Sequence, residues 1–229
     1  MLLRKWEELP EKLRNEQVRP YYDSIENKKM DLFLKYVFDR VLSALMLMLL
    51  CPVFVIIAIM IKLDTDGEVF FRQVRVTQYG KLFKIYKFRT MVKNAEAIGT
   101  QVTTSRDMRV TKVGAKLRGC RLDELPQLIN ILKGEMSFVG TRPEVVKYVE
   151  QYTPEMYATL LLPAGVTSEA SIEYKDEERL LDGAIDADKV YVEQILPAKM
   201  KVNLKSLLSF SFYKDIHIMW ETIFAVLNK

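Results

Sequence analysis

The feature that most constrains the fold of this chain is an uncharged run, Val41–Ile61. At about 1.5 Å per residue, a helix over this run measures roughly 30 Å, which matches the hydrocarbon core of a bilayer. The run is almost entirely apolar, and it therefore predicts one helix embedded in a membrane. The simplest such helix crosses the bilayer once.

Two features of the run favour a helix that enters and leaves through the same leaflet. Pro52 lies at its middle, where a proline removes a backbone hydrogen bond and bends a helix. Basic residues also flank the run on both sides: Lys28, Lys29, Lys35 and Arg40 before it, and Lys62, Arg72 and Arg75 after it. The positive-inside tendency then places both ends in the cytoplasm. We therefore expect a re-entrant helix that is broken at Cys51 and Pro52.

Composition limits the classes of protein to which the rest of the chain can belong. The 229 residues suit one domain with its own core, and the net charge of +4 fits an anionic lipid or a phosphorylated ligand. No zinc-finger, RNP or basic-zipper pattern is present, so nucleic acid is not an expected partner. Two cysteines, Cys51 and Cys120, are too few for a disulfide framework, and the single histidine, His217, has no evident partner residue. Hydrolase triads and zinc chemistry therefore lack the residues that they need.

The order of the segments predicts an α+β fold that is mostly helical. Residues 1–30 read as a short amphipathic helix and a tether at the membrane surface, residues 31–63 as the re-entrant helix with its entry region, and residues 64–229 as a cytoplasmic domain. Within that domain, Val69–Val76 and Leu82–Arg89 alternate like the strands of a β-hairpin, with Gly80 in the connection. Polar residues over Val92–Val110 predict a loop, and Ser137–Gly140 predicts a short extended segment.

Further helices are expected over four segments: Thr111–Gly119, Glu144–Leu162, Asp188–Lys205 and Leu207–Leu227. Thr111 suits the N-cap of the first, while Pro163 and Gly165 end the second. The last segment is rich in aromatic residues. It fits either a core helix or an amphipathic helix at the membrane surface.

The stretch Arg118–Pro143 carries the residues best suited to chemistry. Two adjacent carboxylates, Asp123 and Glu124, stand directly before a helical pattern. One apolar face of that pattern consists of Leu125, Leu128, Ile129 and Leu132. Pro126 fits the first turn of the helix, where its missing N–H costs nothing, and Gly134 ends it.

A carboxylate before a helix is most often a cap for the unpaired N–H groups of the first turn. The same N–H groups and the partial positive charge of the helix end also bind phosphates and keep a carboxylate ionised. Arg118 and Arg121 before the acidic pair and Arg142 after it add further positive charge. An ionised carboxylate among phosphate-binding groups can act as a nucleophile in phosphoryl transfer.

The run LDELPQLINILKGEMSFVGTRPE resembles the signature of the bacterial sugar transferases, also called monotopic phosphoglycosyl transferases. The segments DRVLSALMLMLLCPVFVIIAIMIKLDTDGEVFFRQVRV, KLFKIYKFRTM and DMRVTKVGAKLR add to the likeness, which spans most of Asp31–Glu144 in the family's order. The chain departs from the family at two places. Cys51 and Pro52 stand where many members have Ser-Pro, and Gly165–Ala170 lacks a Trp and a Gln-Val-x-Gly-Arg run.

The resemblance implies that a sugar 1-phosphate moves from a UDP-sugar to a membrane polyprenyl (undecaprenyl) phosphate, with release of UMP, as the first membrane step of glycan assembly. Asp123 would be the nucleophile that forms an aspartyl phosphosugar, and Glu124 would bind Mg²⁺ with Asp123 or handle a proton. The phosphate contacts implied by the motifs are Arg118 and Arg142 with Pro143. The cations of the hairpin are candidates for the same work: Lys87, Arg89, Arg72 and Arg75. They also fit a solvated sheet edge, where lysine and arginine are common.

The resemblance also implies a location at the bacterial inner membrane, with residues 64–229 as a catalytic domain that faces the cytoplasm. Membrane lipid is an expected partner, and a homodimer is left open. Two other classes of protein remain. One is a single-span membrane adaptor whose basic cytoplasmic domain binds anionic lipid or a partner. The other is a lipid phosphatase that forms a phosphoenzyme on Asp123 and then uses water.

Overall fold

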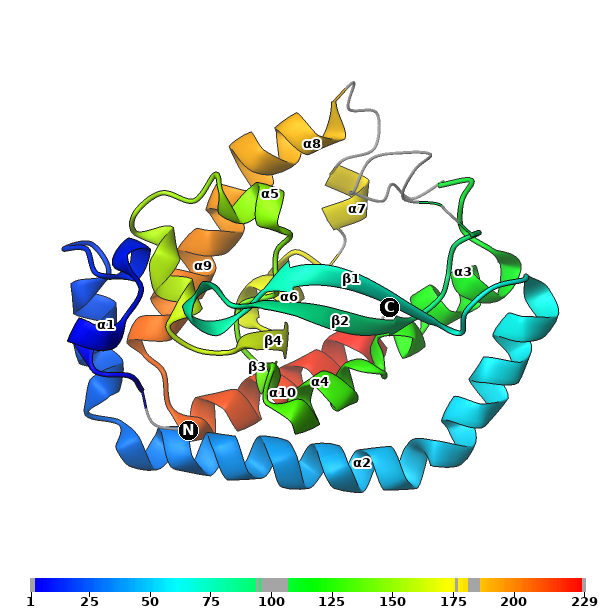
Figure 1. Ribbon diagram of the computed structural model, residues 1–229, viewed down its shortest axis with the longest axis horizontal. Helices are drawn as coiled ribbons and strands as arrows, with labels where there is room; N and C mark the ends of the chain where they lie inside the picture. The colour runs from blue at the N-terminus through cyan, green and yellow to red at the C-terminus, as the bar shows by residue number, and fades with distance from the viewer. Residues whose placement is uncertain (1–2, 94, 96–106, 176, 181–185, 228–229) are drawn as a thin grey trace.

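One helix, α2 (Lys29–Asp64), contains the whole predicted membrane run and extends along one side of the molecule (Figure 1). The structure is a computed structural model that describes residues 3–93, 95, 107–175, 177–180 and 186–227. Most of the predicted loop Val92–Val110 lies outside these residues. The ends of that loop meet in an isolated bridge between Met91 and Val110.

The helix α2 stays continuous through Pro52, and its second half turns towards α3 (Lys112–Gly119) (Figure 1). Because α2 contains no glycine, we attribute the turn to the proline. The prediction of one long apolar helix is confirmed, and the break expected at Cys51 and Pro52 is a bend within it. The re-entrant path through a membrane stays a prediction.

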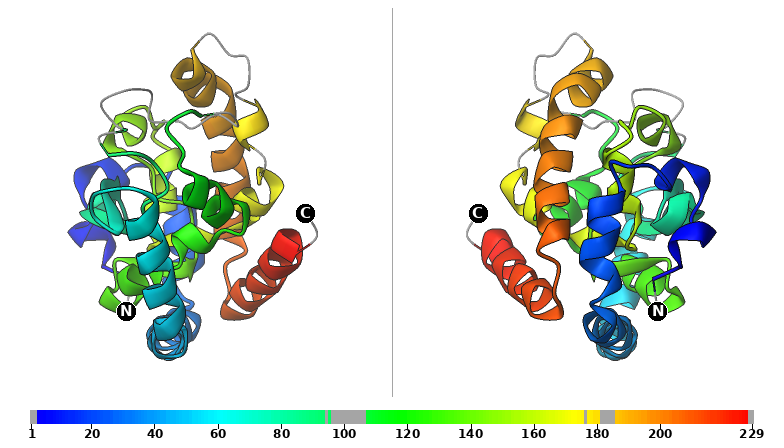
Figure 2. Two further views of the ribbon diagram at one scale, coloured as in Figure 1. Left: turned by 90° about the vertical axis from the view of Figure 1, so that its right-hand side faces the viewer. Right: turned by 90° about the vertical axis from the view of Figure 1, so that its left-hand side faces the viewer.

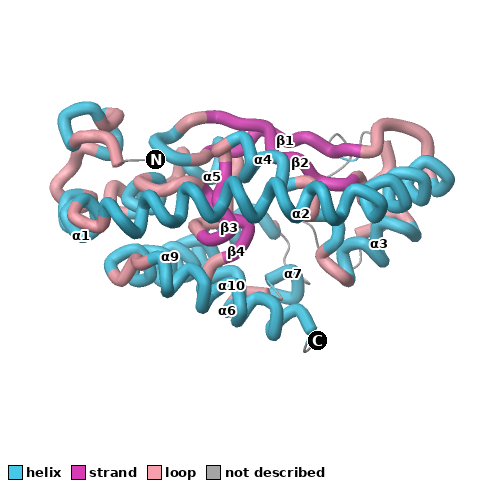
Figure 3. The backbone as a smooth tube through the Cα atoms, turned by 90° about the horizontal axis from the view of Figure 1, so that it is seen from below, coloured by secondary structure: helices cyan, strands magenta, loops and turns pink. Residues whose placement is uncertain are grey.

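Most of the apolar surface of α2 is not covered by the rest of the molecule. Only 11% of its most apolar stretch is buried, and the helix is long and apolar enough to cross a membrane. The exposed side chains include Val41, Leu45, Met48, Leu49, Val55, Ile56, Ile59 and Leu63. The final helix, α10 (Phe212–Leu227), lies beside α2 in the end-on views of Figure 2 and in the view from below in Figure 3. The two helices thus present a broad apolar surface on one side.

The side of α2 that faces the domain carries polar residues one turn apart. Lys35 Nζ lies 2.6 Å from Asp215 Oδ2 on α10, and Asp39 Oδ1 accepts a hydrogen bond from the backbone N–H of Phe138 at 3.3 Å. Ser43 continues this stripe and is fully buried. Since buried charges must be paired, these contacts fix which face of α2 turns towards the domain.

The predicted β-hairpin is confirmed. β1 (Phe70–Val76) pairs antiparallel with β2 (Leu82–Phe88) from Phe70↔Phe88 to Val76↔Leu82. A short 3₁₀ turn, Gln78–Gly80, connects the strands.

A second, parallel sheet pairs β3 (Met136–Val139) with β4 (Ala164–Thr167). The sequence predicted β3 as an extended segment but gave no indication of β4. The backbones of Gly140 and Gly165 approach so closely that no larger residue fits at Gly165. A Cβ atom there would lie 2.1 Å from the backbone nitrogen of Gly140. This contact fixes the start of the loop that carries Arg142.

Local capping signals around the acidic pair predicted the structure well. Thr111 Oγ1 accepts a hydrogen bond from the N–H of Gly114 at 2.9 Å and caps α3, as expected. The acidic pair lies in a 3₁₀ turn, Leu122–Glu124, followed by α4 (Gln127–Lys133). Gly134 ends α4 with a left-handed conformation, φ 81°.

The predicted apolar face of this region is partly wrong. Leu132 is 42% exposed, whereas Ile131 is fully buried. Leu125 and Pro126 have helical dihedral angles, but their carbonyls accept from Leu128 and Ile129, three residues on. The chain therefore turns there with a three-residue period, and the 3.6-residue pattern does not hold from Leu125.

The helix predicted over Glu144–Leu162 is also wrong. Only α5 (Val146–Val149) is α-helical there, and a 3₁₀ segment, Met156–Leu160, follows. Pro154 lacks a backbone N–H and disfavours the helical conformation for Thr153, which separates the two pieces. Short helices follow: α6 (Glu169–Glu173), α7 (Glu177–Leu180) and α8 (Ala187–Val190). A π-helical turn (Tyr191–Ile195) then leads into α9 (Leu196–Leu208), so the helix expected around Pro197 is present.

The N-terminal segment is a packed cap on the domain instead of the predicted tether. Two 3₁₀ turns, Trp6–Glu8 and Glu11–Leu13, precede α1 (Arg19–Glu26). Their apolar side chains lie in one buried cluster with residues of α9 and of the 3₁₀ segment Met156–Leu160. The mostly helical α+β fold with small sheets is confirmed.

Candidate active site

A cleft of about 2280 Å³ opens between the β-hairpin and the C-terminal half of the chain. All the charged residues that the sequence put forward line it, together with one proline: Asp123, Glu124, Arg118, Arg142, Pro143, Lys87, Arg89, Arg72 and Arg75. We call the side built from residues 70–142 the motif wall and the side built from residues 144–226 the C-terminal wall. Cys51 and Pro52 are not among the described residues that line the cleft.

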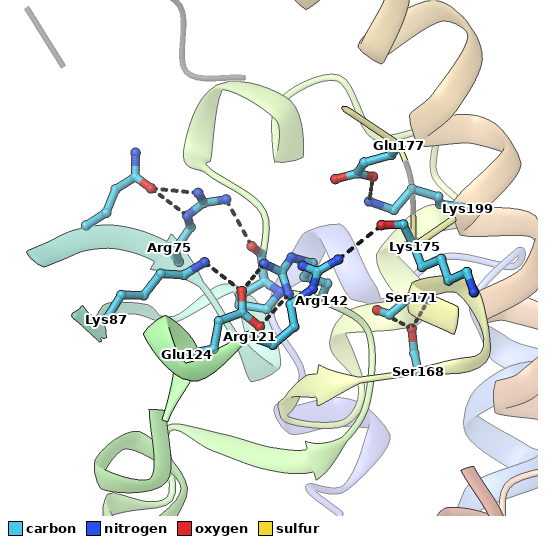
Figure 4. Close-up of polar contacts among 12 residues, drawn as sticks. Arg75, Lys87, Arg121, Glu124, Arg142, Ser168, Ser171, Lys175, Glu177 and Lys199 are labelled. Carbon is cyan, nitrogen blue, oxygen red and sulfur yellow. Dashed lines mark hydrogen bonds and ion pairs between the residues drawn. The ribbon is translucent and has the colours of Figure 1, made fainter. Parts of the chain in front are cut away.

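A strained residue directs the acidic pair into the cleft. Arg121 has φ 57°, in the left-handed region, at the point where α3 ends and the acidic turn begins. This conformation costs an L-residue other than glycine about 1 kcal/mol. The side chain of Arg121 donates a hydrogen bond across the cleft to the carbonyl of Lys175 at 3.0 Å (Figure 4). The left-handed conformation of Arg121 changes the direction of the chain after α3. Asp123 and Glu124 therefore lie in a separate turn and do not continue that helix.

Glu124 is held between two cations. Its Oε1 lies 2.8 Å from Lys87 Nζ and 2.5 Å from Arg142 Nη2 (Figure 4). Burial alone would raise the pKa of Glu124, but the charges of Arg142 and Lys87 outweigh it and hold the pKa well below its usual range. The Glu124 carboxylate in turn raises the pKa of Arg142. Glu124 is therefore ionised and held by both cations, mainly through Oε1.

Its neighbour Asp123 lies in a different environment. The residue is 7% exposed, and its carboxylate makes no hydrogen bond or ion pair within the described part of the chain. Burial raises the pKa of Asp123, the charge of Glu124 adds to this, and Lys87, Arg118 and Arg142 oppose it. Two adjacent carboxylates with such different surroundings can take different roles in one reaction. Glu124 positions cations, and Asp123 is available to react.

The other predicted cations have structural contacts of their own. Arg75 Nη1 donates to the carbonyl of Pro143 at 3.2 Å, which connects the hairpin to the loop after β3. Arg89 donates to the carbonyls of Thr65 and Asp66 in the turn after α2. On the outer strand the exposed Arg72 pairs with Glu68 at 3.0 Å.

Several residues that line the cleft were not predicted. Gln127 is 1% exposed, and neither its amide nitrogen nor its amide oxygen has a hydrogen-bond partner within the described residues. On the C-terminal wall, Tyr191 Oη donates to Glu144 Oε1 at 2.6 Å. Glu144 directly follows the Thr-Arg-Pro motif, so its position in the sequence could have marked it as a residue of the cleft. Tyr191 comes from a distant helix, and nothing local in the sequence marks it.

In the part of the chain that the structure describes, the acidic pair lacks the neighbours for a preformed magnesium site. No group of three or more His, Cys, Asp or Glu residues that could hold a metal ion occurs among the described residues. Lys87 and Arg142 both bind Oε1 of Glu124, and its Oε2 lies 3.5 Å from Arg142 Nη1, so a metal would compete with these cations for Glu124, and Asp123 is the uncommitted carboxylate. Mg²⁺ is commonly bound by one or two carboxylates together with substrate phosphates and water. The site fits that mode and not a preformed protein cage.

Comparison with known proteins settles the family. The family model for bacterial sugar transferases matches residues 30–229. The chain belongs to the bacterial sugar transferase family. The resemblance seen in the motifs is thus confirmed, and the N-terminal cap before Met30 precedes the region that this family shares.

Individual relatives of this sugar transferase differ in length. It is 35% identical over 200 residues to the UDP-N-acetylgalactosamine-undecaprenyl-phosphate N-acetylgalactosaminephosphotransferase of Aeromonas hydrophila, across 86% of this chain and 44% of that protein. It is 36% identical to the UDP-glucose:undecaprenyl-phosphate glucose-1-phosphate transferase of Escherichia coli (strain K12), across 93% of this chain and 44% of that protein. It is 34% identical to the exopolysaccharide production protein PSS of Rhizobium leguminosarum bv. phaseoli, across 87% of this chain and 98% of that protein. The chain therefore spans less than half of the first two relatives and nearly all of the third.

Proposed function

We propose that this protein transfers a sugar 1-phosphate from a UDP-sugar to undecaprenyl phosphate, in two steps through an aspartyl phosphosugar on Asp123. The observation that carries the proposal is the contrast within the acidic pair. Glu124 is paired with Lys87 and Arg142, while Asp123 faces the same cations without a bond of its own. The family and the substrates named in its relatives support the same reaction.

In the first step, a carboxylate oxygen of Asp123 attacks the phosphorus that carries the sugar. A new P–O bond to Asp123 forms, the P–O bond to UMP breaks, and UMP leaves with the electron pair. Negative charge grows on the leaving phosphate, and Arg142, Arg118 and Lys87 are the cations of the motif wall placed to stabilise it. Glu124 holds two of these cations in position.

In the second step, a phosphate oxygen of undecaprenyl phosphate attacks the same phosphorus. The P–O bond to Asp123 breaks, the carboxylate is regenerated, and a diphosphate bond joins the sugar phosphate to the lipid. The nucleophile is already an anion, so this step needs no proton transfer from the protein. Two separate steps let a soluble donor and a membrane acceptor use one site in turn.

Magnesium is part of the proposal. Asp123 would hold the ion together with the diphosphate oxygens of the donor, and Glu124 would join only after releasing one of its cations. When bound, the ion neutralises negative charge on the phosphates.

We also propose that α2 enters and leaves the inner membrane from the cytoplasmic side, so that the catalytic domain faces the cytoplasm. The basic flanks of the run, the bend in α2 and its uncovered apolar surface support this path. The aromatic helix α10 adds exposed Tyr213, Trp220 and Leu227. Such a helix suits the boundary between headgroups and acyl chains. Cysteine labelling from each side of the membrane would test the path, since labelling of the N-terminus only from outside would exclude it.

The reaction is tested by incubating the purified protein with a panel of UDP-sugars, with and without undecaprenyl phosphate. We expect UMP release with lipid for at least one donor. Without lipid, we expect a covalent mass increment of one phosphosugar on Asp123. A membrane adaptor would release no UMP with any donor, and a lipid phosphatase would release inorganic phosphate from the polyprenyl substrate instead. A verified donor that never labels Asp123 would exclude the two-step route.

A further inference from the structure

The cleft changes in chemical character along its length. Around the acidic pair it is lined by cations, as described above. Seven of the eight residues of α2 and α10 that line it carry no charge, and the exception is Lys62 near the C-terminal end of α2. The seven, at the other end of the cleft, are Leu42, Met46, Met219, Thr222, Ile223, Ala225 and Val226. We call this end the α2–α10 seam. Behind it lie apolar residues of the core, among them Leu128, Phe138 and Ile172.

The two helices of the seam are joined firmly at one end only. Asp31 Oδ1 accepts a hydrogen bond from the N–H of Phe212 at 2.9 Å, and the Lys35–Asp215 ion pair lies next to it. Further along, α10 makes a polar contact with β4, through the hydroxyl groups of Thr222 and Thr167 at 2.7 Å. Figure 3 shows the two helices separating from that joined end. The seam is therefore a space between diverging helices.

The seam also opens at the apolar surface of the molecule. The outer sides of the same helices expose Leu45 and Leu49 on α2 and Trp220 and Ile223 on α10. Ile223 both lines the cleft and is 48% exposed, so it lies at the mouth. An apolar passage therefore leads from the surface assigned to the membrane to the cations beside Asp123.

We propose that the α2–α10 seam binds the isoprenoid chain of the lipid acceptor. This inference rests on the proposed function. An acceptor with a phosphate head and a long apolar tail must bring the head to Asp123 while its tail stays out of water. A cleft with cations at one end and an uncharged, membrane-facing seam at the other matches both halves of such a molecule. The donor is polar throughout and has no group that gains from the seam.

The seam can be tested by filling it from either side. Ala225→Trp adds bulk from α10, and Met46→Trp adds bulk from α2. The matched control is His217→Trp on α10, whose side chain is 71% exposed and does not line the cleft. Each variant is assayed in lipid nanodiscs, with the UDP-sugar that gives the fastest UMP release in the wild type.

We expect both seam variants to raise the KM for undecaprenyl phosphate at least tenfold, while labelling of Asp123 in the absence of lipid stays within twofold of wild type. With a short-chain prenyl phosphate as acceptor, we expect their rates to stay within about threefold of wild type, because a short tail does not need the whole seam. His217→Trp should match the wild type in all three assays.

A wild-type KM for undecaprenyl phosphate in both seam variants would overturn the proposal. So would an equal loss of labelling without lipid, since the seam would then support the fold or the donor and not the tail. Failure of the proposed function gives a different result, in which the wild type itself releases no UMP and carries no label.

A photoreactive polyprenyl phosphate gives a readout that does not depend on turnover. We expect it to cross-link to residues 219–226 of α10 and to be displaced by excess undecaprenyl phosphate. Labelling that excess undecaprenyl phosphate does not displace would indicate general contact with lipid. Displaceable labelling elsewhere on the chain, with none at residues 219–226, would place the tail outside the seam. Either of these outcomes overturns the proposal.

Discussion

The two walls of the cleft differ in how their charges are used. On the motif wall, cations outnumber carboxylates, and Lys87 and Arg142 converge on Glu124 beside the unengaged Asp123. On the C-terminal wall, cations and carboxylates line the cleft in nearly equal number, and Lys199 and Glu177 form an ion pair at 2.7 Å. A wall with excess positive charge suits a diphosphate, whereas a balanced wall suits neutral groups such as a sugar. From this comparison we propose that phosphate chemistry is located on the motif wall and donor selection on the C-terminal wall.

The largest effect should follow from Asp123→Asn on the motif wall. An amide is a far weaker nucleophile than a carboxylate, so we expect UMP release to fall by about 1000-fold or more. The variant should still fractionate with membranes, because α2 and α10 are unchanged. Comparable UMP release by wild type and variant would show that Asp123 is not the nucleophile. The proposed difference in function between the two walls would then have no support.

The next effect should follow from Arg142→Ala. Loss of one charged donor from a preorganised site typically costs about 100-fold in rate, and here Glu124 also loses a partner. We expect a drop of that order in UMP release at saturating donor. The matched control is Arg19→Ala, which removes the Arg19–Asp23 ion pair outside the cleft and should change the rate less than twofold. Equal effects of the two substitutions would show a loss of folded protein and not of phosphate binding.

A smaller effect is expected on the C-terminal wall. Tyr191→Phe removes the hydroxyl that donates to Glu144 and leaves a buried carboxylate without its donor. If, as we propose, this wall contacts the donor and not the reacting phosphorus, the KM for the UDP-sugar should rise by about three- to tenfold with little change in kcat. Tyr21→Phe is the control, because its 2.6 Å hydrogen bond to Glu155 lies outside the cleft. A fall in kcat as large as that of Arg142→Ala would place Tyr191 in the chemistry instead.

The two walls also differ in how well they could be predicted from the sequence. The motif wall is built from short-range signals: alternation in the hairpin, the Thr111 cap, and the glycine that ends α4. The C-terminal wall depends on contacts between distant segments. The strand β4 exists because it pairs with β3, and Pro154 interrupts a helix that periodicity alone would allow.

The distinction between Asp123 and Glu124 shows the same limit within the motif wall. Both carboxylates belong to one 3₁₀ turn, and nothing in their local sequence separates them. Glu124 is engaged because Lys87 comes from β2 and Arg142 from the loop after β3, and only the tertiary fold brings these two together. The family resemblance implied different roles for the two carboxylates, and the contacts support that proposal.

The pH dependence of Asp123 labelling tests this electrostatic difference between the two carboxylates. We call the loss of labelling at low pH the acid limb. Asp123 must be ionised to attack, so labelling without lipid should be lost as the pH falls through its raised pKa. In Glu124→Gln, a negative neighbour disappears, and Lys87 and Arg142 lose the carboxylate that neutralises them. Both changes stabilise the ionised form of Asp123, so its pKa falls and the acid limb should move to lower pH, whatever happens to the maximal rate.

Single-turnover labelling of Asp123 over a pH series, in wild type and in Glu124→Gln, measures this shift without the lipid step. Gln127→Leu is a useful companion, since it alters a buried neutral side chain of the cleft and should leave the position of the acid limb unchanged. The acid limb of Glu124→Gln could instead stay in place or move to higher pH. Either result would mean that the pH dependence does not report Asp123 under the influence of Glu124, Lys87 and Arg142. The contrast within the acidic pair would then lose its electrostatic basis, even if both residues proved essential.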